Sequence, residues 1–384
     1  MFSESESINN LPSKQVPVVI MENSELQLMY NPNLHLFENS IAGPPELGKK
    51  QEAYLRRLIS EIEALKDNGA SVAKEFFGGA RIEIPFGVAS GSAYGSKFLK
   101  RYEELGYGFV TQKTVRVKRW SGNPMPHVMH VGEGDYPAGF KSSDTPTTSL
   151  ANSFGMSCLG PGFWESDLSL FVKTSRVPLI ISGVVTEPKD KYNLIDQYAS
   201  IASAAKKIGA VAFEANVSCP NEMEGRSGEL QDDTPICTEI IKETKRLGFP
   251  VLIKIGYKKD LSPIVSEIGK IADGIVAINT ISARITDAKG GYAYVNRERA
   301  GVSGRPLKPY AEDALKQLVS LREEFGYRYK IFSVGGVTSG NDVLSRLLAG
   351  ADFVESAAMA MLYPPLALET KKILLENCDA INSF

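Results

Sequence analysis

Residues 215–225 read ANVSCPNEMEG and place Cys219 where an apolar run gives way to a polar, glycine-bearing loop. A buried cysteine usually serves as a small apolar filler. A cysteine in a cleft can also act as a base, because its free pKa of about 8.5 lies close enough to neutrality for modest tuning. Taken alone, the segment therefore allows both a packing role and a chemical role for Cys219.

Lys254 lies inside the apolar run VLIKIG. A lysine in a buried strand costs free energy unless an anionic or polar group meets it. The pattern indicates a functional cation, and a structural ion pair is the alternative.

Two asparagines, Asn216 and Asn279, end other apolar runs, and Gly335-Gly336 precede a helix that opens with Gly340-Asn341. Backbone N–H groups in such a glycine loop suit a phosphate, although a tight strand–helix turn also uses glycine. A lysine beside the ring, amide side chains matching its C=O and N–H groups, and a phosphate loop together fit flavin mononucleotide (FMN).

The elements that would position these residues alternate between short apolar runs and segments with helical periodicity. The runs cover residues 81–89, 108–112, 177–185, 210–218, 250–256, 274–280, 330–336 and 351–357. Repeated strand–helix alternation predicts parallel strands, and eight units predict an α/β fold of the closed (β/α)8, or TIM-barrel, type. An open doubly wound sheet is the alternative.

Chemistry in such a barrel sits at the C-terminal ends of the strands. The polar or glycine- and alanine-bearing ends are Ser90, Lys113, Asn216, Cys219, Lys254, Asn279, Thr280, Gly335, Gly336, Ala357 and Ala358, with Asn152 in an excursion between the second and third strands. No cluster of Asp or Glu joins them. His127 and His130 fall in an irregular Pro-rich stretch and are expected to be exposed loop residues, so no metal site is predicted.

Residues 1–80 form an N-terminal extension and residues 81–384 the barrel domain. Leu55, Leu58, Ile59, Ile62 and Leu65 recur at helical spacing within residues 51–67, and Asn68-Gly69 follow as a C-cap. This amphipathic helix is expected to pack on the barrel.

The chain has 384 residues, a formal net charge of -2 and four cysteines without paired spacing. This composition indicates neither a nucleic-acid surface, nor a disulfide framework, nor an iron–sulfur cluster. The N-terminus lacks the pattern of a secretory signal, and the apolar stretches are too short to cross a membrane. The sequence therefore predicts a cytoplasmic enzyme that acts on a small molecule. A homodimer is expected, because it is the commonest assembly.

The segment NVSCPN resembles the signature of the dihydroorotate dehydrogenases, in particular the class whose catalytic base is cysteine. The resemblance covers roughly residues 82–370 and includes the motifs ASG (89–91), KTVRVKRWSGNPMPH (113–127), NSFGM (152–156), IKIG around Lys254, INT (278–280), GVSGRPLKP (301–309) and VGGVTSGND (334–342). Their order and spacing match along the whole barrel.

The resemblance implies that FMN oxidises dihydroorotate to orotate, with Cys219 removing the C5 proton and a loop over residues 219–230 closing on the substrate. Substrate contacts would come from Lys113, Asn152, Asn216, Asn221, Asn279 and Thr280, with the substrate carboxylate on the backbone of Ser153, Phe154, Gly155 and Met156. Flavin contacts would come from Ala89, Ser90, Gly91, Lys113, Asn216, Lys254, Gly304, Gly335, Gly336, Ala357 and Ala358.

Ala357 and Ala358 stand where the family commonly has a Gly-Thr pair, which removes one hydroxyl from the phosphate site. The nearest alternative is an enzyme of the dihydropyrimidine dehydrogenase type, which shares the cysteine loop. The segment NSFGM favours dihydroorotate, because uracil needs no carboxylate site. A flavin- or phosphate-binding barrel without catalysis is the alternative from another class. The electron acceptor (fumarate, NAD through a partner subunit, or another) is left open.

Overall fold

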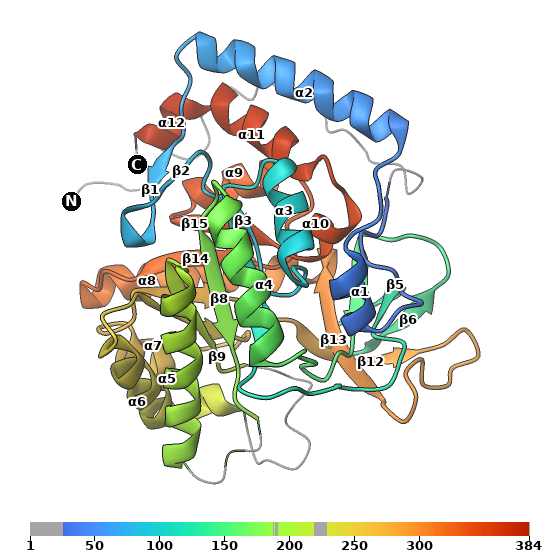
Figure 1. Ribbon diagram of the computed structural model, residues 1–384, viewed down its shortest axis with the longest axis vertical. Coiled ribbons are helices and arrows are strands. Elements are labelled where there is room, and N and C mark those ends of the chain that lie inside the picture. The colour runs from blue at the N-terminus through green and yellow to red at the C-terminus, as the bar shows by residue number, and fades with distance from the viewer. Residues whose placement is uncertain (1–25, 187, 189–190, 219–228, 384) are drawn as a thin grey trace, which may run out of the picture.

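The computed structural model describes residues 26–186, 188, 191–218 and 229–383. Eight parallel strands close into a barrel in the order β10-β11-β14-β15-β3-β4-β8-β9 (Figure 1). These strands are β3 (Phe86–Val88), β4 (Phe109–Val115), β8 (Leu179–Gly183), β9 (Ala212–Asn216), β10 (Val251–Ile255), β11 (Gly274–Ala277), β14 (Lys330–Val334) and β15 (Phe353–Ser356). The eight predicted strands and the closed barrel are confirmed, and the open sheet is wrong.

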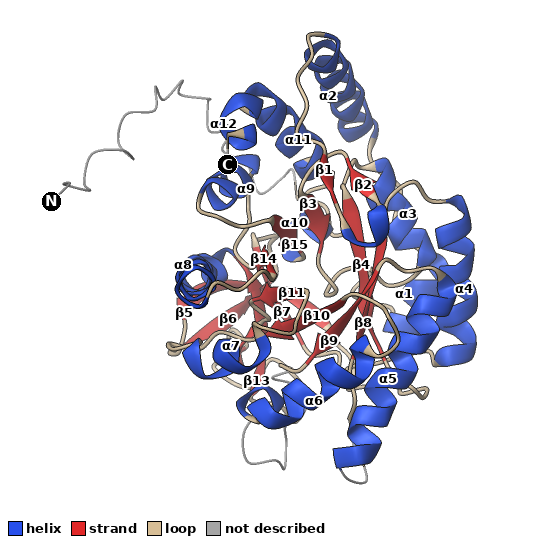
Figure 2. Cartoon of the chain, turned by 90° about the vertical axis from the view of Figure 1, so that its left-hand side faces the viewer, coloured by secondary structure: helices blue, strands red, loops and turns tan. Residues whose placement is uncertain are grey.

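Helices surround the strands (Figure 2). They are α3 (Ser96–Glu104), α4 (Pro161–Thr174), α5 (Lys191–Ile208), α6 (Thr234–Lys245), α7 (Ser262–Ile268), α8 (Lys308–Phe325), α9 (Gly340–Leu348), α10 (Ala358–Leu362), α11 (Leu366–Glu376) and α12 (Cys378–Asn382). Short 3-10 helices are η2 (Phe77–Gly79), η3 (Leu230–Asp232) and η4 (Arg305–Leu307). In the part of the chain that the structure describes, no helix has the length and apolarity needed to cross a membrane.

Alternation along each strand divides the core into two clusters. Residues that point outward join the large cluster between strands and helices, whereas every second residue joins a cluster inside the barrel. The interior cluster includes Phe109, Ala212, Leu252, Phe332 and Phe353. Phe76 closes the N-terminal end of the barrel by stacking on Phe109 at a centroid distance of 4.8 Å. The apolar bottom leaves polar groups only toward the opposite end.

A second sheet lies beside the C-terminal end of the barrel. It consists of β5 (Val128–Asp135), β6 (Gly139–Ser143), β7 (Ser149–Asn152), β12 (Ile281–Thr286) and β13 (Arg299–Gly304), and it closes on itself in the order β12-β13-β7-β5-β6. The predicted excursion between the second and third barrel strands contains β5, β6 and β7, so the expectation of an irregular stretch at His130 is wrong. These strands mix apolar residues with Gly, Ser, Arg and other polar residues, and β7 pairs with β13 about 150 positions away, so no local apolar run marks them.

The N-terminal extension lies against the barrel. Helix α1 (Leu36–Ala42) begins after His35, whose ring meets that of His127 at a centroid distance of 4.7 Å, and α2 (Lys49–Asp67) crosses the outside of α11 (Figure 1). The Tyr54 hydroxyl donates to Glu369 at 2.7 Å, and Lys372 pairs with Glu61 at 2.6 Å. The expected amphipathic helix and its C-cap are confirmed. The strands β1 (Lys74–Glu75) and β2 (Arg81–Ile82) pair across residue 80, and the domain division at that residue stays a prediction.

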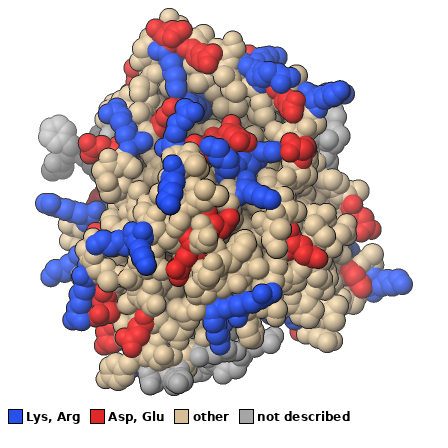
Figure 3. All heavy atoms as spheres, viewed as in Figure 1, with Lys and Arg blue, Asp and Glu red and all other residues tan. Residues whose placement is uncertain are grey.

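Charged side chains of both signs are interspersed over the face shown in Figure 3. Many form exposed ion pairs such as Arg57–Glu61 at 2.8 Å. Exposed pairs contribute at most about 1 kcal/mol each, so the fold depends mainly on its two apolar clusters.

The packing of α2 gives a direct test. Leu58 is buried under the helix, whereas its neighbour Ile59 is exposed. We expect Leu58→Ala to lower the free energy of unfolding by about 2–4 kcal/mol, because it removes buried methyl groups and leaves a cavity. The control Ile59→Ala should cost less than about 1 kcal/mol. Urea unfolding measures both, and equal effects would contradict the packing of α2 on the barrel.

Candidate active site

A cavity at the C-terminal mouth of the barrel collects residues from eight or more separate segments. One part is lined by Ser90, Gly91, Lys113, Val128, Asn152, Phe154, Gly155, Met156, Asn216, Lys254, Asn279 and Thr280, among others. The adjoining part is lined by Ala89, Gly91, Lys254, Asn279, Thr280, Gly304, Gly335, Gly336, Ala357 and Ala358, among others. The two parts share Gly91, Lys254 and Asn279, so they form one continuous groove along the strand ends.

Strands β9 and β10 place an amide and an ammonium side by side on this groove. Asn216 pairs in register with Lys254, and both are inward-facing and buried. Asn216 donates to Thr114 Oγ1 at 3.4 Å, and its backbone carbonyl accepts from the Tyr198 hydroxyl at 2.8 Å. These contacts fix the end of β9 before the chain leaves the barrel.

Asn279 ties the start of the following loop to β11. Its Nδ2 donates to the carbonyl of Ser218, and the Ser218 hydroxyl donates to the Lys254 carbonyl at 3.3 Å. Ser218 is thereby anchored at the mouth. Cys219 and Asn221 lie outside the described residues, as does most of the predicted lid.

Lys254 is 4% exposed, and its Nζ donates to Ser90 Oγ at 2.9 Å. Among the described residues, no carboxylate oxygen lies within 4.0 Å of this ammonium. A buried cation without a contacting anion is poised to receive an electron-rich group from the cavity.

The sequence analysis missed two carboxyl groups below Lys254. Glu214 on β9 and Glu355 on β15 are both buried inside the barrel. Burial raises the pKa of Glu355 to about 8, and the nearby Glu214 adds to the increase while Lys254 opposes it. In the sequence, the only indication was their spacing. Glu214 lies two residues before Asn216 and Glu355 two residues after the buried Phe353, so each glutamate shares the inward face of its strand.

The loop of residues 153–156 forms another wall of the groove, through Phe154, Gly155 and Met156. Gly155 and Met156 have left-handed backbones, with φ of +59° and +52°. The N–H of Ser153 is already bonded to the His127 carbonyl at 2.8 Å, and Ser153 does not line the cavity. The N–H groups of residues 154–156 are therefore the backbone donors that remain for a ligand. Lys113 Nζ lies 5.3 Å from the centroid of the Phe154 ring, close to the same wall.

An aromatic cluster supports this loop from behind. The Phe154 ring meets Tyr30 at 5.8 Å and His127 at 5.3 Å between centroids. His127 Nε2 bonds the Asn123 carbonyl at 2.9 Å, and its Nδ1 lies 3.4 Å from the Tyr30 hydroxyl. His127 is fully buried and His130 lies on β5, so the expectation of exposed loop histidines is wrong. The polar, Pro-rich sequence gave no indication of β5, which lies beside residues of the N-terminal extension such as Tyr30.

The glycine loop of residues 335–338 lines the groove through Gly335, Gly336 and Val337. Gly336 has φ of +71°, and a Cβ there would lie 2.3 Å from the Lys308 backbone. Arg346 donates to the Gly335 carbonyl at 2.5 Å and to Ser333 Oγ at 3.2 Å. Position 336 therefore requires glycine, because its backbone is left-handed and because a Cβ would clash with Lys308. The buried Arg346 guanidinium fixes the loop from below.

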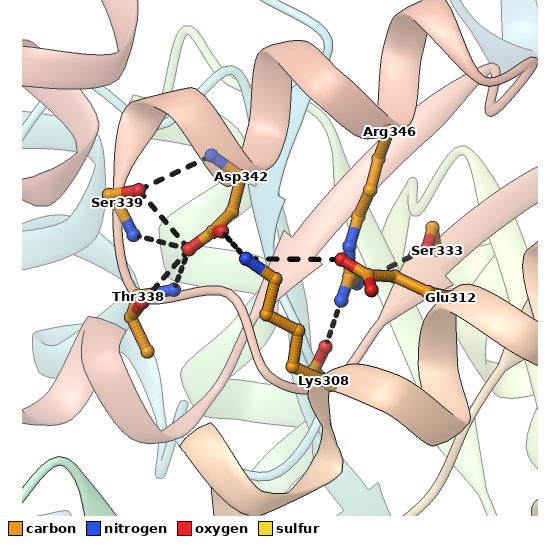
Figure 4. Close-up of polar contacts among 8 residues, drawn as sticks. Lys308, Glu312, Ser333, Thr338, Ser339, Asp342 and Arg346 are labelled. Atoms are coloured by element: carbon orange, nitrogen blue, oxygen red, sulfur yellow. Dashed lines mark hydrogen bonds and ion pairs between the residues drawn. The ribbon is translucent and has the colours of Figure 1, made fainter.

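Asp342 holds the other side of the glycine loop. Its Oδ2 accepts from the backbone N–H and the hydroxyl of both Thr338 and Ser339, and its Oδ1 meets Lys308 Nζ at 2.5 Å (Figure 4). Burial favours the neutral acid, but the Lys308 and Thr338 bonds outweigh it and lower the pKa of Asp342 overall. These bonds fix residues 338 and 339, next to the part of the glycine loop, up to Val337, that lines the groove.

Comparison with known proteins identifies this arrangement. The family model for dihydroorotate dehydrogenase matches residues 72–365, which is most of the chain. The chain belongs to the dihydroorotate dehydrogenase family. The match contains all eight barrel strands, the second sheet and the glycine loop.

Curated relatives cover the same region. The dihydroorotate dehydrogenase of Dictyostelium discoideum is 27% identical over 322 residues, covering 76% of this chain and 86% of that protein. The mitochondrial dihydroorotate dehydrogenase (quinone) of Mus musculus is 26% identical and covers 77% of this chain and 73% of its own length. The catalytic subunit of dihydroorotate dehydrogenase B (NAD(+)) of Geobacter metallireducens is 25% identical and covers 78% of this chain and 92% of its own length.

The buried histidine behind the 153–156 loop gives a pH prediction for this family member. Burial lowers the pKa of His127 to about 4. Between that value and about 6.5, the unfolded chain holds a proton that the folded protein rejects, so the free energy of unfolding rises with pH across this window. We expect His127→Gln to flatten that rise by up to about 3 kcal/mol. Urea unfolding at several pH values measures the difference, and identical slopes for both proteins would contradict the buried, neutral state of His127.

Proposed function

We propose that this chain is an FMN-dependent dihydroorotate dehydrogenase that oxidises dihydroorotate to orotate in pyrimidine biosynthesis. The observation that carries the proposal is the continuous groove in which a buried ammonium, two fixed asparagines and the 153–156 loop meet a glycine loop. Because the chain belongs to this family, oxidoreductase activity is expected.

The groove fits FMN in the chemistry of its donors. The glycines of the 335–338 loop and Gly304 have no side chain, so a ligand can approach their backbone closely. At Gly304 no side chain would fit, because a Cβ would lie 2.2 Å from the Thr148 carbonyl oxygen. Backbone N–H groups of the glycine loop and around Ala357 and Ala358, which line this part of the groove, would hold the phosphate. The remaining proposed flavin contacts are Ala89, Ser90, Gly91, Lys113, Asn216 and Lys254, which line the same groove.

FMN, when bound, supplies the hydride acceptor, and Lys254 would stabilise the negative charge that develops at the ring edge. Lys113, Asn152, Asn216, Asn221, Asn279 and Thr280 would orient the pyrimidine through amide, hydroxyl and ammonium groups. The N–H groups of residues 154–156 would bind the substrate carboxylate. The asparagines are held by Ser218 and Thr114, so their orientation is set before substrate arrives.

Cys219 would take the proton from C5 while the hydride leaves C6 for the flavin, so that the C5=C6 double bond forms. Its thiolate suits this role because a thiol can be deprotonated near neutral pH. The described part of the loop supports the placement, because Asn279 and Lys254 anchor Ser218, the residue just before Cys219. A homodimer and a cytoplasmic location stay predictions from the sequence.

The role of Cys219 is tested by substitution. We expect Cys219→Ala to keep FMN bound but to slow flavin reduction by dihydroorotate about 10²-fold or more, the usual weight of a general base. Cys219→Ser should retain activity that increases with pH, because a hydroxyl is a poorer base. Stopped-flow absorbance measures the reductive half-reaction. Reduction of the alanine variant at the native rate would exclude Cys219 as the base.

The substrate class is tested by ligand binding. Orotate carries a carboxylate and uracil does not, so the 153–156 loop should bind orotate about 10- to 150-fold more tightly, the equivalent of one charge-assisted hydrogen bond. Titration of the oxidised protein by flavin absorbance measures both affinities. Equal or tighter binding of uracil would move the protein to the dihydropyrimidine dehydrogenase type and leave the Cys219 mechanism standing.

A further inference from the structure

Three successive carbonyl groups of the 153–156 loop accept hydrogen bonds from donors that lie outside the groove. The pairs are Arg297 Nη1 with the Ser153 carbonyl at 3.4 Å, the Asn123 N–H with the Phe154 carbonyl at 3.1 Å, and the Trp120 indole N–H with the Gly155 carbonyl at 3.0 Å. None of these three donors lines the groove. The loop is therefore held from behind, peptide group by peptide group.

The carbonyl directions decide where the N–H groups of the loop point. In a trans peptide group the C=O and N–H bonds point in opposite directions. The three bonded carbonyls share their peptide groups with the N–H groups of Phe154, Gly155 and Met156, and these three residues line the groove. Donors behind the loop thus direct three N–H groups toward the place proposed for the substrate carboxylate.

The peptide group between Gly155 and Met156 is held in a strained orientation. Both residues lie in a turn and have positive φ, +59° and +52°. Two positive φ values are typical of a type I′ turn, whereas glycine followed by a larger residue suits type II′, in which only the first φ is positive. Rotation of this one peptide group interconverts the two types. It would relieve Met156, because a left-handed backbone disfavours any residue with a Cβ.

Trp120 is placed to prevent that rotation. Its backbone exchanges two hydrogen bonds with Cys158, at 2.9 and 2.8 Å, and the Arg116 guanidinium lies 4.8 Å from the centroid of its ring. The fixed indole then donates to the Gly155 carbonyl. After rotation this bond would be lost, and the carbonyl oxygen would face the groove, where it would repel an anionic ligand.

We propose that Trp120 determines the preference for an anionic pyrimidine, because its indole N–H keeps the Gly155–Met156 peptide group turned so that the Met156 N–H faces the groove. This inference rests on the proposed function, since it assigns the carboxylate of the substrate to the 153–156 loop. Trp120 acts through the loop and does not line the groove, so it is a positioning residue.

The variant Trp120→Phe tests this role, because it keeps an aromatic ring and removes the N–H donor. Titration of the oxidised, FMN-loaded protein by flavin absorbance measures the affinities for orotate and uracil. We expect orotate to bind about 5- to 30-fold more weakly, the equivalent of one left-handed residue with a side chain. Uracil should keep its native affinity, because it has no carboxylate, and this result also shows that the variant is folded.

Two further variants control for general damage. Trp164→Phe makes the same change at the other tryptophan of the chain, whose indole N–H donates to the Arg116 carbonyl at 3.3 Å. It should leave both affinities unchanged. Trp120→Met also lacks the donor, so it should match Trp120→Phe, and it takes its place if the phenylalanine variant does not fold.

A second substitution separates peptide orientation from packing. Glycine adopts positive φ without strain, so Met156→Gly removes the advantage of the rotated peptide group. In the Trp120→Phe background it should bring the orotate-to-uracil affinity ratio to within about 2-fold of the Met156→Gly single variant, because about half of the molecules then have the competent turn. A purely structural role of Trp120 would not respond to this change.

The outcomes distinguish this inference from the proposed function. An unchanged affinity ratio in Trp120→Phe, an equal loss for orotate and uracil, or no recovery in the double variant would overturn the role of Trp120 and leave the proposed function standing. A wild-type protein that binds uracil as tightly as orotate would refute the proposed function, and the role of Trp120 with it.

Discussion

Closure of eight parallel strands into a barrel gives every strand one inward face, and the active-site groove follows from that constraint. No strand of the barrel has an unpaired edge, and each second residue of these strands points to the interior. On β9, β10 and β15 the inward positions change from apolar to charged or polar within two residues. The apolar bottom supplies stability, and the polar level and the mouth supply chemistry. Lys254 is buried at this level, where its ammonium donates to Ser90.

The remaining elements complete the mouth from outside the barrel. The second sheet brings Asn152 to Gly301, and the extension packs Tyr30 behind Phe154. The glycine loop is held separately by Arg346 and Asp342. The strand ends, the 153–156 loop and the glycine loop therefore surround one groove, and each has its own supporting contacts. Such a groove could bind a ligand at both its phosphate and its flat ring.

Much of this architecture could be predicted from the sequence. The eight strands were marked by apolar runs, and Lys254 was marked by its position inside one of them. The second sheet could not be predicted, because its strands lack continuous apolar runs and the pairings that join its parts, β7 with β13 and β6 with β12, link residues distant in sequence. Glu214 and Glu355 were missed, because a single glutamate in a strand that alternates apolar and polar residues is typical of a side chain that points outward to solvent. Only barrel closure shows that both point to the same interior.

Anaerobic titration of the purified, FMN-loaded protein with dihydroorotate tests the central claim most directly. One equivalent should bleach the flavin absorbance near ~450 nm and yield one equivalent of orotate, because FMN accepts one hydride per substrate. Dihydrouracil at the same concentration should leave the spectrum unchanged on that timescale. A flavin that stays oxidised with dihydroorotate, or that bleaches with dihydrouracil instead, would contradict the assignment of this groove to dihydroorotate.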